Sequence, residues 1–353
     1  MKLALMEAHK AIGNTKTNPA VGCVVVRNDC IISAASTSRN GRPHAEHNAI
    51  KLCKENVRNA KLYVTLEPCS HYGKTPPCVA TIIKSKIKKV YFSIKDPDPR
   101  SFNKSSSQFK RKNIVVKEGI YSEEVNNFYR SYLKYKKDDL PFVTSKLAIS
   151  KDFYTSNVKK KWLTNRYSRG RVHLMRSEHD CILTSAQTIV DDNPILNCRI
   201  KGLEYDSPCK IILDKNLITP TKSRIIKKTK NYNTLIFYNR DNKKKIKIFK
   251  KHKIKLIKTK LDSDGNFDLR SLLIKIKKIG YPRIFLECGV NLTSKFLSNN
   301  LVDDFHLFIS NHKIRKNGYN SFKKNMSLFL KNKKSTTKNI NLLGDKLISY
   351  NIK

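Results

Sequence analysis

The chain has 353 residues, of which 39% are hydrophobic, and a formal net charge of +44. At about 100–200 residues per domain, this length predicts two domains with packed cores. No run of residues approaches the roughly 20 consecutive apolar positions of a membrane-spanning helix. Glu7 and His9 interrupt the apolar core that a secretory signal would need. The nine cysteines are scattered and odd in number, so we expect reduced thiols in a cytoplasmic protein with no membrane partner.

The positive charge would ordinarily point to nucleic acid, through neutralisation of phosphates and release of counterions. In this chain the lysines are dispersed among abundant Asn and Ile, as drift in an AT-rich coding sequence produces, and basic repeats interleaved with aromatic residues are absent. We therefore expect no specific nucleic-acid partner. A positive field would more usefully attract a small phosphorylated substrate.

The first part of the chain alternates predicted strands and helices. The apolar, β-branched run 21–26, bounded by Asn18-Pro19 and Asn28-Asp29, predicts a buried strand that pairs with 31–35 as a hairpin. This alternation predicts an α/β domain with a mixed sheet over residues 1–139, ending in a polar linker at 134–139. The further elements expected are a helix over 44–55, a strand over 61–66, a helix whose first part is 79–84, and strands over 90–94 and 114–116.

The second part, residues 140–353, again predicts an α/β domain. Lys243 to Lys260 alternates lysine with Ile, Phe or Leu, which favours a helix followed by a strand with solvated lysines over a nucleic-acid or membrane patch. The expected strands are 142–148, 181–184, 210–213, 234–237 and 283–286, and helical character is expected over 165–177 and 269–279.

The chemistry lies in His44-Ala45-Glu46, followed by Pro68-Cys69 and Pro77-Cys78. One imidazole and two thiolates supply three zinc ligands and leave a fourth tetrahedral position for water. Glu46 is not a ligand, and it can carry a proton from that water to a leaving amine. The pattern therefore predicts one catalytic Zn²⁺ per chain and hydrolytic deamination. A pair of buried free thiols and a satisfied histidine is the alternative, which the occurrence of all four residues in this order disfavours.

Zinc base deaminases share the His-x-Glu and Pro-Cys motifs but have two residues between the cysteines, whereas eight intervene here. With this long loop, the segments 18–26, 44–46 and 65–78 together resemble the bifunctional riboflavin-biosynthesis deaminase/reductase family. The resemblance continues at the segments 96–99, 141–143, 146–148, 162–164, 188–194 and 287–289.

This resemblance implies a cytidine-deaminase-like three-layer α/β/α domain followed by a dihydrofolate-reductase-like α/β domain. It also implies two reactions: zinc-dependent hydrolytic deamination of 2,5-diamino-6-(5-phosphoribosylamino)pyrimidin-4(3H)-one, then reduction of 5-amino-6-(5-phosphoribosylamino)uracil to the ribityl product by NADPH. We expect a homo-oligomer.

The resemblance also assigns roles to individual residues. In the first domain it assigns substrate contacts to Asn18, His71 and Lys74, although Lys74 alone would also suit a solvated loop. In the second it assigns substrate contacts to Lys160, Arg176, Leu196, Arg199 and Glu287. Arg176 and Arg199 suit a phosphate, which a guanidinium fork grips in a bidentate way, although either would also suit a surface ion pair. The implied cofactor contacts are Ala148, Trp162, Thr188, Asp192, Lys215, Gly289, Val290, Asn291, Leu292, Thr293, Ser294 and Lys295.

The chain departs from the family pattern in the second domain. Phe153 and Ser294 stand where glycine is usual, and the segment 158–162 lacks a usual Gly-x-Ser-x-Trp, which offsets Lys160 by two residues. A side chain at Phe153 or Ser294 is expected to crowd the cofactor or to require a positive φ. This leaves open an enzyme that is a deaminase only, with a decayed reductase domain. A nucleic-acid-binding base deaminase is the alternative of another class, and the long loop between the cysteines argues against it.

Overall fold

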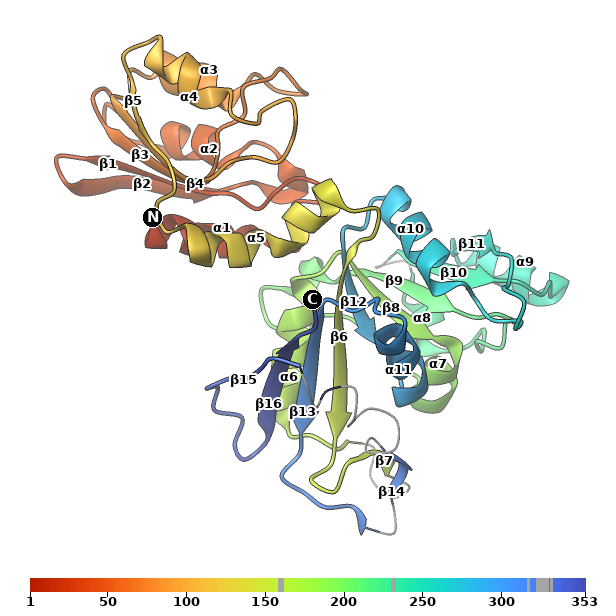
Figure 1. Cartoon of the computed structure of the whole chain (residues 1–353). Helices are drawn as coiled ribbons and strands as arrows, with labels where there is room; N and C mark the ends of the chain where they lie inside the picture. Colours follow the sequence, from red (N-terminus) through yellow and green to blue (C-terminus); the bar gives the residue numbers. More distant parts are fainter. Residues whose placement is uncertain (158–161, 230–232, 316–317, 322–329, 331–332) are drawn as a thin grey trace. The chain divides into compact units, whose positions relative to one another are not determined.

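The computed structural model describes residues 1–157, 162–229, 233–315, 318–321, 330 and 333–353. The chain divides into two compact units, Met1–Asp139 and Leu140–Lys353 (Figure 1). None of the described helices is long and apolar enough to cross a membrane.

The first unit is a three-layer α/β/α fold around a five-stranded mixed sheet of order β2-β1-β3-β4-β5 (Figure 1). Strand β1 is antiparallel to β2 and β3, whereas β3, β4 and β5 are parallel. Helices α1 and α5 cover one face, and α2, α3 and α4 cover the other. The elements are α1 (Lys2–Ala11), β1 (Gly22–Arg27), β2 (Cys30–Ser36), η1 (Arg39–Gly41), α2 (Ala45–Leu52), β3 (Lys61–Leu66), α3 (Cys78–Lys84), β4 (Lys89–Ile94), α4 (Ser105–Lys110), β5 (Val115–Lys117) and α5 (Ser122–Lys137).

The predicted strands of this half are confirmed, but the predicted linker is wrong for residues 134–137, which form the last turn of α5. Val125 and Tyr129, one helical turn apart, are the buried stripe of α5. Three lysines in the last turn interact favourably with the negative end of the helix dipole. A cluster of charges that suggests a linker in the sequence therefore ends a helix.

A buried chain of hydrogen bonds joins the layers of this unit. The Gly22 amide donates to Thr65 Oγ1 (3.1 Å), the Thr65 hydroxyl lies 2.7 Å from Tyr129 Oη, and Tyr129 Oη donates to the Ala20 carbonyl (2.9 Å). A Cβ at Gly22 would lie 1.8 Å from the Ala4 carbonyl oxygen, so only glycine lets α1 pack directly on β1.

The second unit is built on a nine-stranded sheet of order β11-β10-β9-β8-β12-β6-β13-β16-β15, in which the run from β11 to β13 is parallel. Strands β7 and β14 form a separate antiparallel pair. The strands are β6 (Phe142–Ile149), β7 (Tyr154–Asn157), β8 (Cys181–Ser185), β9 (Cys209–Leu213), β10 (Thr234–Tyr238), β11 (Lys255–Lys258), β12 (Arg283–Glu287), β13 (Asp304–Ile309), β14 (Gly318–Ser321), β15 (Ser335–Thr337) and β16 (Lys346–Asn351). The helices are α6 (Arg166–Ser177), α7 (Ala186–Asp192), η2 (Glu204–Asp206), α8 (Arg224–Lys227), α9 (Lys243–Lys251), α10 (Leu269–Ile279) and α11 (Val290–Ser298).

The prediction of a helix followed by a strand over residues 243–260 is confirmed by α9 and β11. Phe249 is the buried residue of α9, and the lysines of this helix are exposed except Lys245, whose Nζ donates to the Leu217 and Thr219 carbonyls.

The buried carboxylate of Glu67 fixes the loops at the carboxyl edge of the first sheet. Glu67 directly follows β3 and is 3% exposed. It accepts hydrogen bonds from the backbone amides of Asp96, Asn103 and Ser105, at 3.1–3.2 Å, and from Ser105 Oγ at 2.9 Å. The loop between β4 and α4 is therefore attached to the segment that leads to Cys69.

We expect Glu67→Ala to destabilise the loop 96–105 by about 2–4 kcal/mol, because hydrogen bonds to a charged group contribute about 1.5–3 kcal/mol and their buried donors would be left unpaired. Hydrogen–deuterium exchange of the segment 96–105 measures this as an increase of at least about tenfold in the exchange rate. Glu55→Ala, at an exposed loop position, is the control. An unchanged exchange rate in Glu67→Ala would contradict this account.

Candidate functional site

Three potential metal ligands meet where elements of the first unit begin and end. His44 caps the start of α2, Cys69 follows β3, and Cys78 is the first residue of α3. Their ligand atoms lie within 4.8 Å of one another, and the described residues contain this one group of the kind. His44 Nδ1 is 3.3 Å from Cys78 Sγ and 3.5 Å from Cys69 Sγ.

The chemistry of this donor set fits zinc, which takes imidazole nitrogen and thiolate sulfur in tetrahedral sites. The hydrogen bond between the two thiols lowers the pKa of Cys69 to about 4 and raises that of Cys78. The Cys78 amide also donates to Cys69 Sγ, at 3.3 Å. These hydrogen bonds favour the thiolate form of Cys69, which is the form that binds a metal.

The carboxyl group of Glu46 lies in the first turn of α2, beside these ligands. Glu46 is 3% exposed, and its Oε2 has no hydrogen-bond partner among the described residues. Burial raises the pKa of Glu46 to about 7. A carboxyl group with that pKa can accept and return a proton near neutral pH.

The three residues predicted to contact substrate in this unit lie in loops. Asn18 Nδ2 donates to the Gly41 carbonyl (3.0 Å), just before the His44 segment. His71 Nδ1 lies 2.9 Å from Ser101 Oγ, and Lys74 is exposed. His71 and Lys74 both belong to the turn 70–77, which separates the two cysteines.

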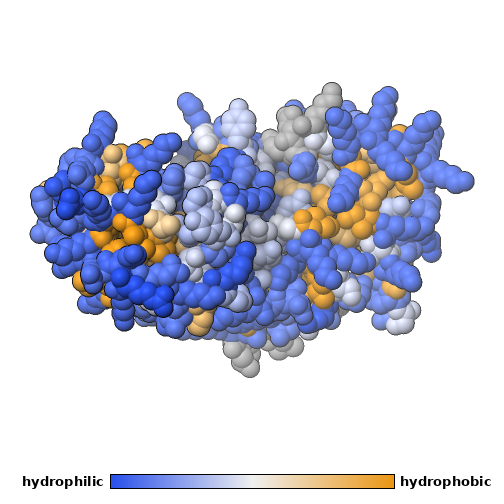
Figure 2. Space-filling view, turned by 90° about the horizontal axis from the view of Figure 1, so that it is seen from above, coloured by the Kyte–Doolittle hydropathy of each residue, from blue (hydrophilic) through white to orange (hydrophobic). Residues whose placement is uncertain are grey.

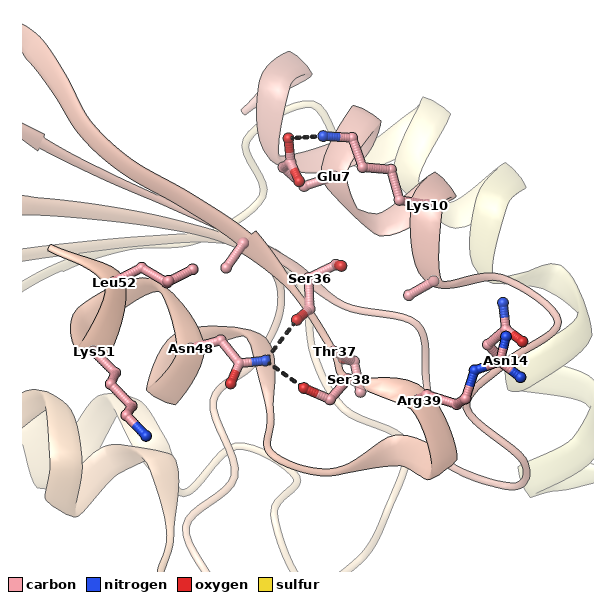
Figure 3. Close-up of a pocket in the computed structure, with 12 residues that line it drawn as sticks. Glu7, Lys10, Asn14, Ser36, Thr37, Ser38, Arg39, Asn48, Lys51 and Leu52 are labelled. Carbon is pink, nitrogen blue, oxygen red and sulfur yellow. Dashed lines mark hydrogen bonds and ion pairs between the residues drawn. The ribbon is translucent and has the colours of Figure 1, made fainter. Parts of the chain in front are cut away.

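A polar groove lies beside α1, the end of β2 and α2 (Figure 3). Asn48 of α2 lines it and donates from Nδ2 to the Ser36 carbonyl (2.9 Å) and to Ser38 Oγ (2.8 Å). The residues that line the groove do not include the three ligands or Glu46. Asn48 therefore fixes the position of the helix that presents His44.

In the second unit, the residues predicted to hold NADPH, apart from Trp162, lie at or after the carboxyl ends of parallel strands. Ala148 lies near the end of β6, and Lys215 follows β9. Thr188 and Asp192 lie on α7, directly after β8. Gly289 caps α11, whose first six residues are the predicted contacts Val290–Lys295, and a Cβ at Gly289 would meet no atom within 4 Å. Ligands of parallel sheets bind at this edge.

The guanidinium fork of Arg176 is occupied by a carboxylate of the protein. Arg176 Nε and Nη2 donate to Glu287 at 2.9 and 2.8 Å, and its Nη1 donates to the Asn197 carbonyl (2.9 Å). Burial raises the pKa of Glu287, but the charges of Arg176 and Lys146 outweigh burial and bring that pKa down to about 2. Arg176 therefore lies in a buried ion pair, in place of the predicted bidentate grip on phosphate.

Lys146, which was not among the predicted site residues, also contacts Glu287. Its Nζ lies 3.4 Å from Glu287 Oε1, because β6 and β12 are in register with Lys146 opposite Glu287. The sequence gives no signal of this register, which only the pairing of strands distant along the chain establishes.

The remaining predicted residues have diverse surroundings. Leu196 is buried, with φ of 54°. Arg199 is exposed and donates to Asn197 Oδ1 (3.0 Å), so its charge is accessible to an anion. Trp162 is 57% exposed, with the Arg169 guanidinium 5.0 Å from the ring centre. Lys160 lies outside the described residues.

The two departures from glycine have different outcomes. Phe153 adopts φ of 69°, a left-handed conformation that costs a side chain about 1–2 kcal/mol. Ser294 lies inside α11 and donates to the Asn291 carbonyl, so no positive φ arises there. The expected strain is therefore confirmed at Phe153 and wrong at Ser294.

Comparison with known proteins agrees with this arrangement. Residues 1–94 match the cytidine and deoxycytidylate deaminase zinc-binding region, and residues 141–312 match the RibD C-terminal domain. Riboflavin biosynthesis protein RibD of Aquifex aeolicus is 33% identical over 88% of this chain and 85% of its own length. That of Actinobacillus pleuropneumoniae is 32% identical over 88% of this chain and 82% of its own length.

The solved structures extend the likeness to both units. The diaminohydroxyphosphoribosylaminopyrimidine deaminase/5-amino-6-(5-phosphoribosylamino)uracil reductase of Thermotoga maritima superposes with a TM-score of 0.86 at 30% identity, covering 99% of this chain and 97% of its own. The predicted deaminase-like and reductase-like folds are thereby confirmed. The chain belongs to the RibD family of riboflavin biosynthesis, whose members join a zinc-dependent deaminase and an NADPH-dependent reductase in one polypeptide.

Proposed function

We propose that His44, Cys69 and Cys78 hold one zinc ion and that Glu46 moves the protons of the deamination. The observation that carries this assignment is the meeting of three ligand atoms within 4.8 Å beside a buried carboxyl group. We assign the deaminase to residues 1–139 and the reductase to residues 140–353.

Zinc supplies Lewis-acid activation of water when it is bound. Glu46 takes a proton from the water as the water oxygen bonds to the ring carbon that carries the amine, and it delivers this proton to the adjacent ring nitrogen. It then carries the second proton of that oxygen to the exocyclic amine nitrogen. The bond between the ring carbon and the amine nitrogen breaks, the oxygen remains as a carbonyl, and ammonia leaves. Asn18, His71 and Lys74 bind the phosphoribosyl pyrimidine, and burial of Glu46 keeps its pKa near the range in which it can serve both steps.

For the reductase we propose that NADPH occupies the edge formed by Ala148, Thr188, Lys215 and α11, where it supplies a hydride to the ribosyl group. Arg199 binds the substrate phosphate with its exposed guanidinium. Arg176 acts through Glu287, because it holds that carboxylate at the end of β12. In the proposed site, the substrate is also contacted by Glu287 and Leu196. The cofactor is also contacted by Trp162 and Asp192.

We further propose a cytoplasmic homo-oligomer without a specific nucleic-acid partner. Nine free cysteines suit a reducing compartment. Figure 2 shows hydrophilic side chains over most of the visible surface and apolar side chains gathered in smaller patches, which suit contacts between subunits.

Cys69→Ala is expected to lose most of its bound zinc, because two protein ligands remain of three. Metal analysis of the purified variant measures the zinc per chain. Cys53→Ala, which removes a thiol outside the ligand group, is the matched control and should keep full occupancy. Full occupancy in Cys69→Ala would refute the ligand assignment.

Glu46→Gln is expected to keep its zinc and to release ammonia at least about 10²–10⁴-fold more slowly, since proton transfer by a positioned group contributes a factor of that size. Ammonia release from the diamino substrate is the measurement, with Glu55→Gln as a control for the same change of charge. Turnover near that of the wild type would exclude Glu46 as the proton carrier.

The wild-type chain is expected to oxidise NADPH when the deaminated phosphoribosylamino-uracil is added. Arg199→Ala should raise the KM for that substrate about tenfold or more, which corresponds to about 1.4 kcal/mol of lost phosphate binding. Arg270→Ala, on the exposed side of α10, should leave KM unchanged. If millimolar NADPH is not oxidised by a sample whose deaminase is active, the deaminase-only alternative is correct.

A further inference from the structure

Arg42 contacts the turn between the two cysteines from outside the ligand group. It lies in extended backbone two residues before His44 and is half-buried. Its Nη1 donates to Thr75 Oγ1, within the turn 70–77. The segment that presents one proposed zinc ligand is thereby connected to the turn that joins the other two.

A second contact packs the same guanidinium against the turn. A Cβ built on Gly73 would lie 3.2 Å from Arg42 Nη2, so the guanidinium packs closely against the backbone of the turn at this position. That Cβ would also lie 4.0 Å from His71 Nε2. The Gly73 amide donates to the Thr75 carbonyl (3.3 Å) and closes the turn around the same point.

His71 is held on one side by a side-chain contact and belongs to the turn that Arg42 contacts. Its Nδ1 lies 2.9 Å from Ser101 Oγ, in the loop that Glu67 fixes. Lys74 directly follows Gly73 in the same turn. Loops of this kind are mobile unless contacts order them, and ordering a loop in advance lowers the cost of binding.

We propose that Arg42 is a positioning residue of the deaminase, which holds the turn 70–77 so that His71 and Lys74 meet the phosphoribosyl group of the substrate. The guanidinium suits this task because its planar, rigid group directs Nη1 to Thr75 while it packs against Gly73. Arg42 acts through the turn and leaves the metal and the proton transfer to other residues. The inference rests on the proposed deaminase site.

The test is steady-state ammonia release by the full-length, zinc-loaded chain over a range of concentrations of the diamino substrate. Arg42→Ala is expected to raise KM about tenfold while kcat changes less than about threefold, because the turn must then be ordered by the substrate. Thr75→Val, which removes the hydroxyl acceptor, should change KM in the same direction. The double variant should have a KM no higher than that of Arg42→Ala, because both changes break one contact.

Two control variants and two further measurements separate positioning from other roles. Thr75→Ser keeps the hydroxyl and should retain the wild-type KM, and Arg58→Ala removes the same charge at an exposed position. Zinc content and the reductase rate of each variant, measured in the same samples, should equal those of the wild type.

Several results would overturn the proposal. The first is an unchanged KM in Arg42→Ala. The second is a KM of the double variant at which the two single effects multiply, which would indicate direct contact of Arg42 with phosphate. The third is a loss of zinc with a matching fall in kcat. If Arg42→Ala does not fold, the comparison of KM between Thr75→Val and Thr75→Ser decides, because only the first of these variants loses the hydroxyl that accepts from Arg42. Retained turnover in Glu46→Gln would instead mean that the proposed site itself is wrong.

Discussion

In both units a buried glutamate at the end of a strand determines where the functional side chains lie. Glu67 follows β3 and accepts hydrogen bonds from three backbone amides, and these bonds fix the loops around Cys69 and His71. Glu287 ends β12 and is bound by Arg176 and Lys146. Because a buried carboxylate is costly unless its oxygens are satisfied, each glutamate requires its loops or neighbouring strands to stay in place. The strand ends are consequently the rigid parts of both sites.

Glu46 differs from these two glutamates in a way that matches its proposed role. Its burial is similar to that of Glu67, yet its Oε2 has no partner among the described residues. Burial without full pairing raises the pKa of Glu46 to about 7, whereas the cations around Glu287 bring the pKa of that group down to about 2. The same side chain is thus a paired anion at Glu287, whereas at Glu46 it suits the proposed transfer of protons.

The second unit combines an intact framework with local departures from the family. The Arg176–Glu287 pair and the start of α11 both lie at the carboxyl edge of the sheet, where the proposed reductase site is. Phe153 takes a left-handed conformation that glycine would adopt more cheaply. The strain is confined to a turn before β7, and it affects local stability without removing any of the proposed cofactor contacts.

The sequence by itself predicted the alternating α/β pattern and the residues proposed as zinc ligands and proton carrier, because these predictions depend on residue type and on short spacings. It also predicted the helix and strand over 243–260 from their periodicity. Only the tertiary structure decided that residues 134–137 end a helix, since the buried Tyr129 that anchors α5 bonds to β3 and to the segment before β1. It likewise decided that Arg176 pairs with Glu287, 111 positions away, because the partner of a charge depends on strand register and burial, which local sequence does not contain.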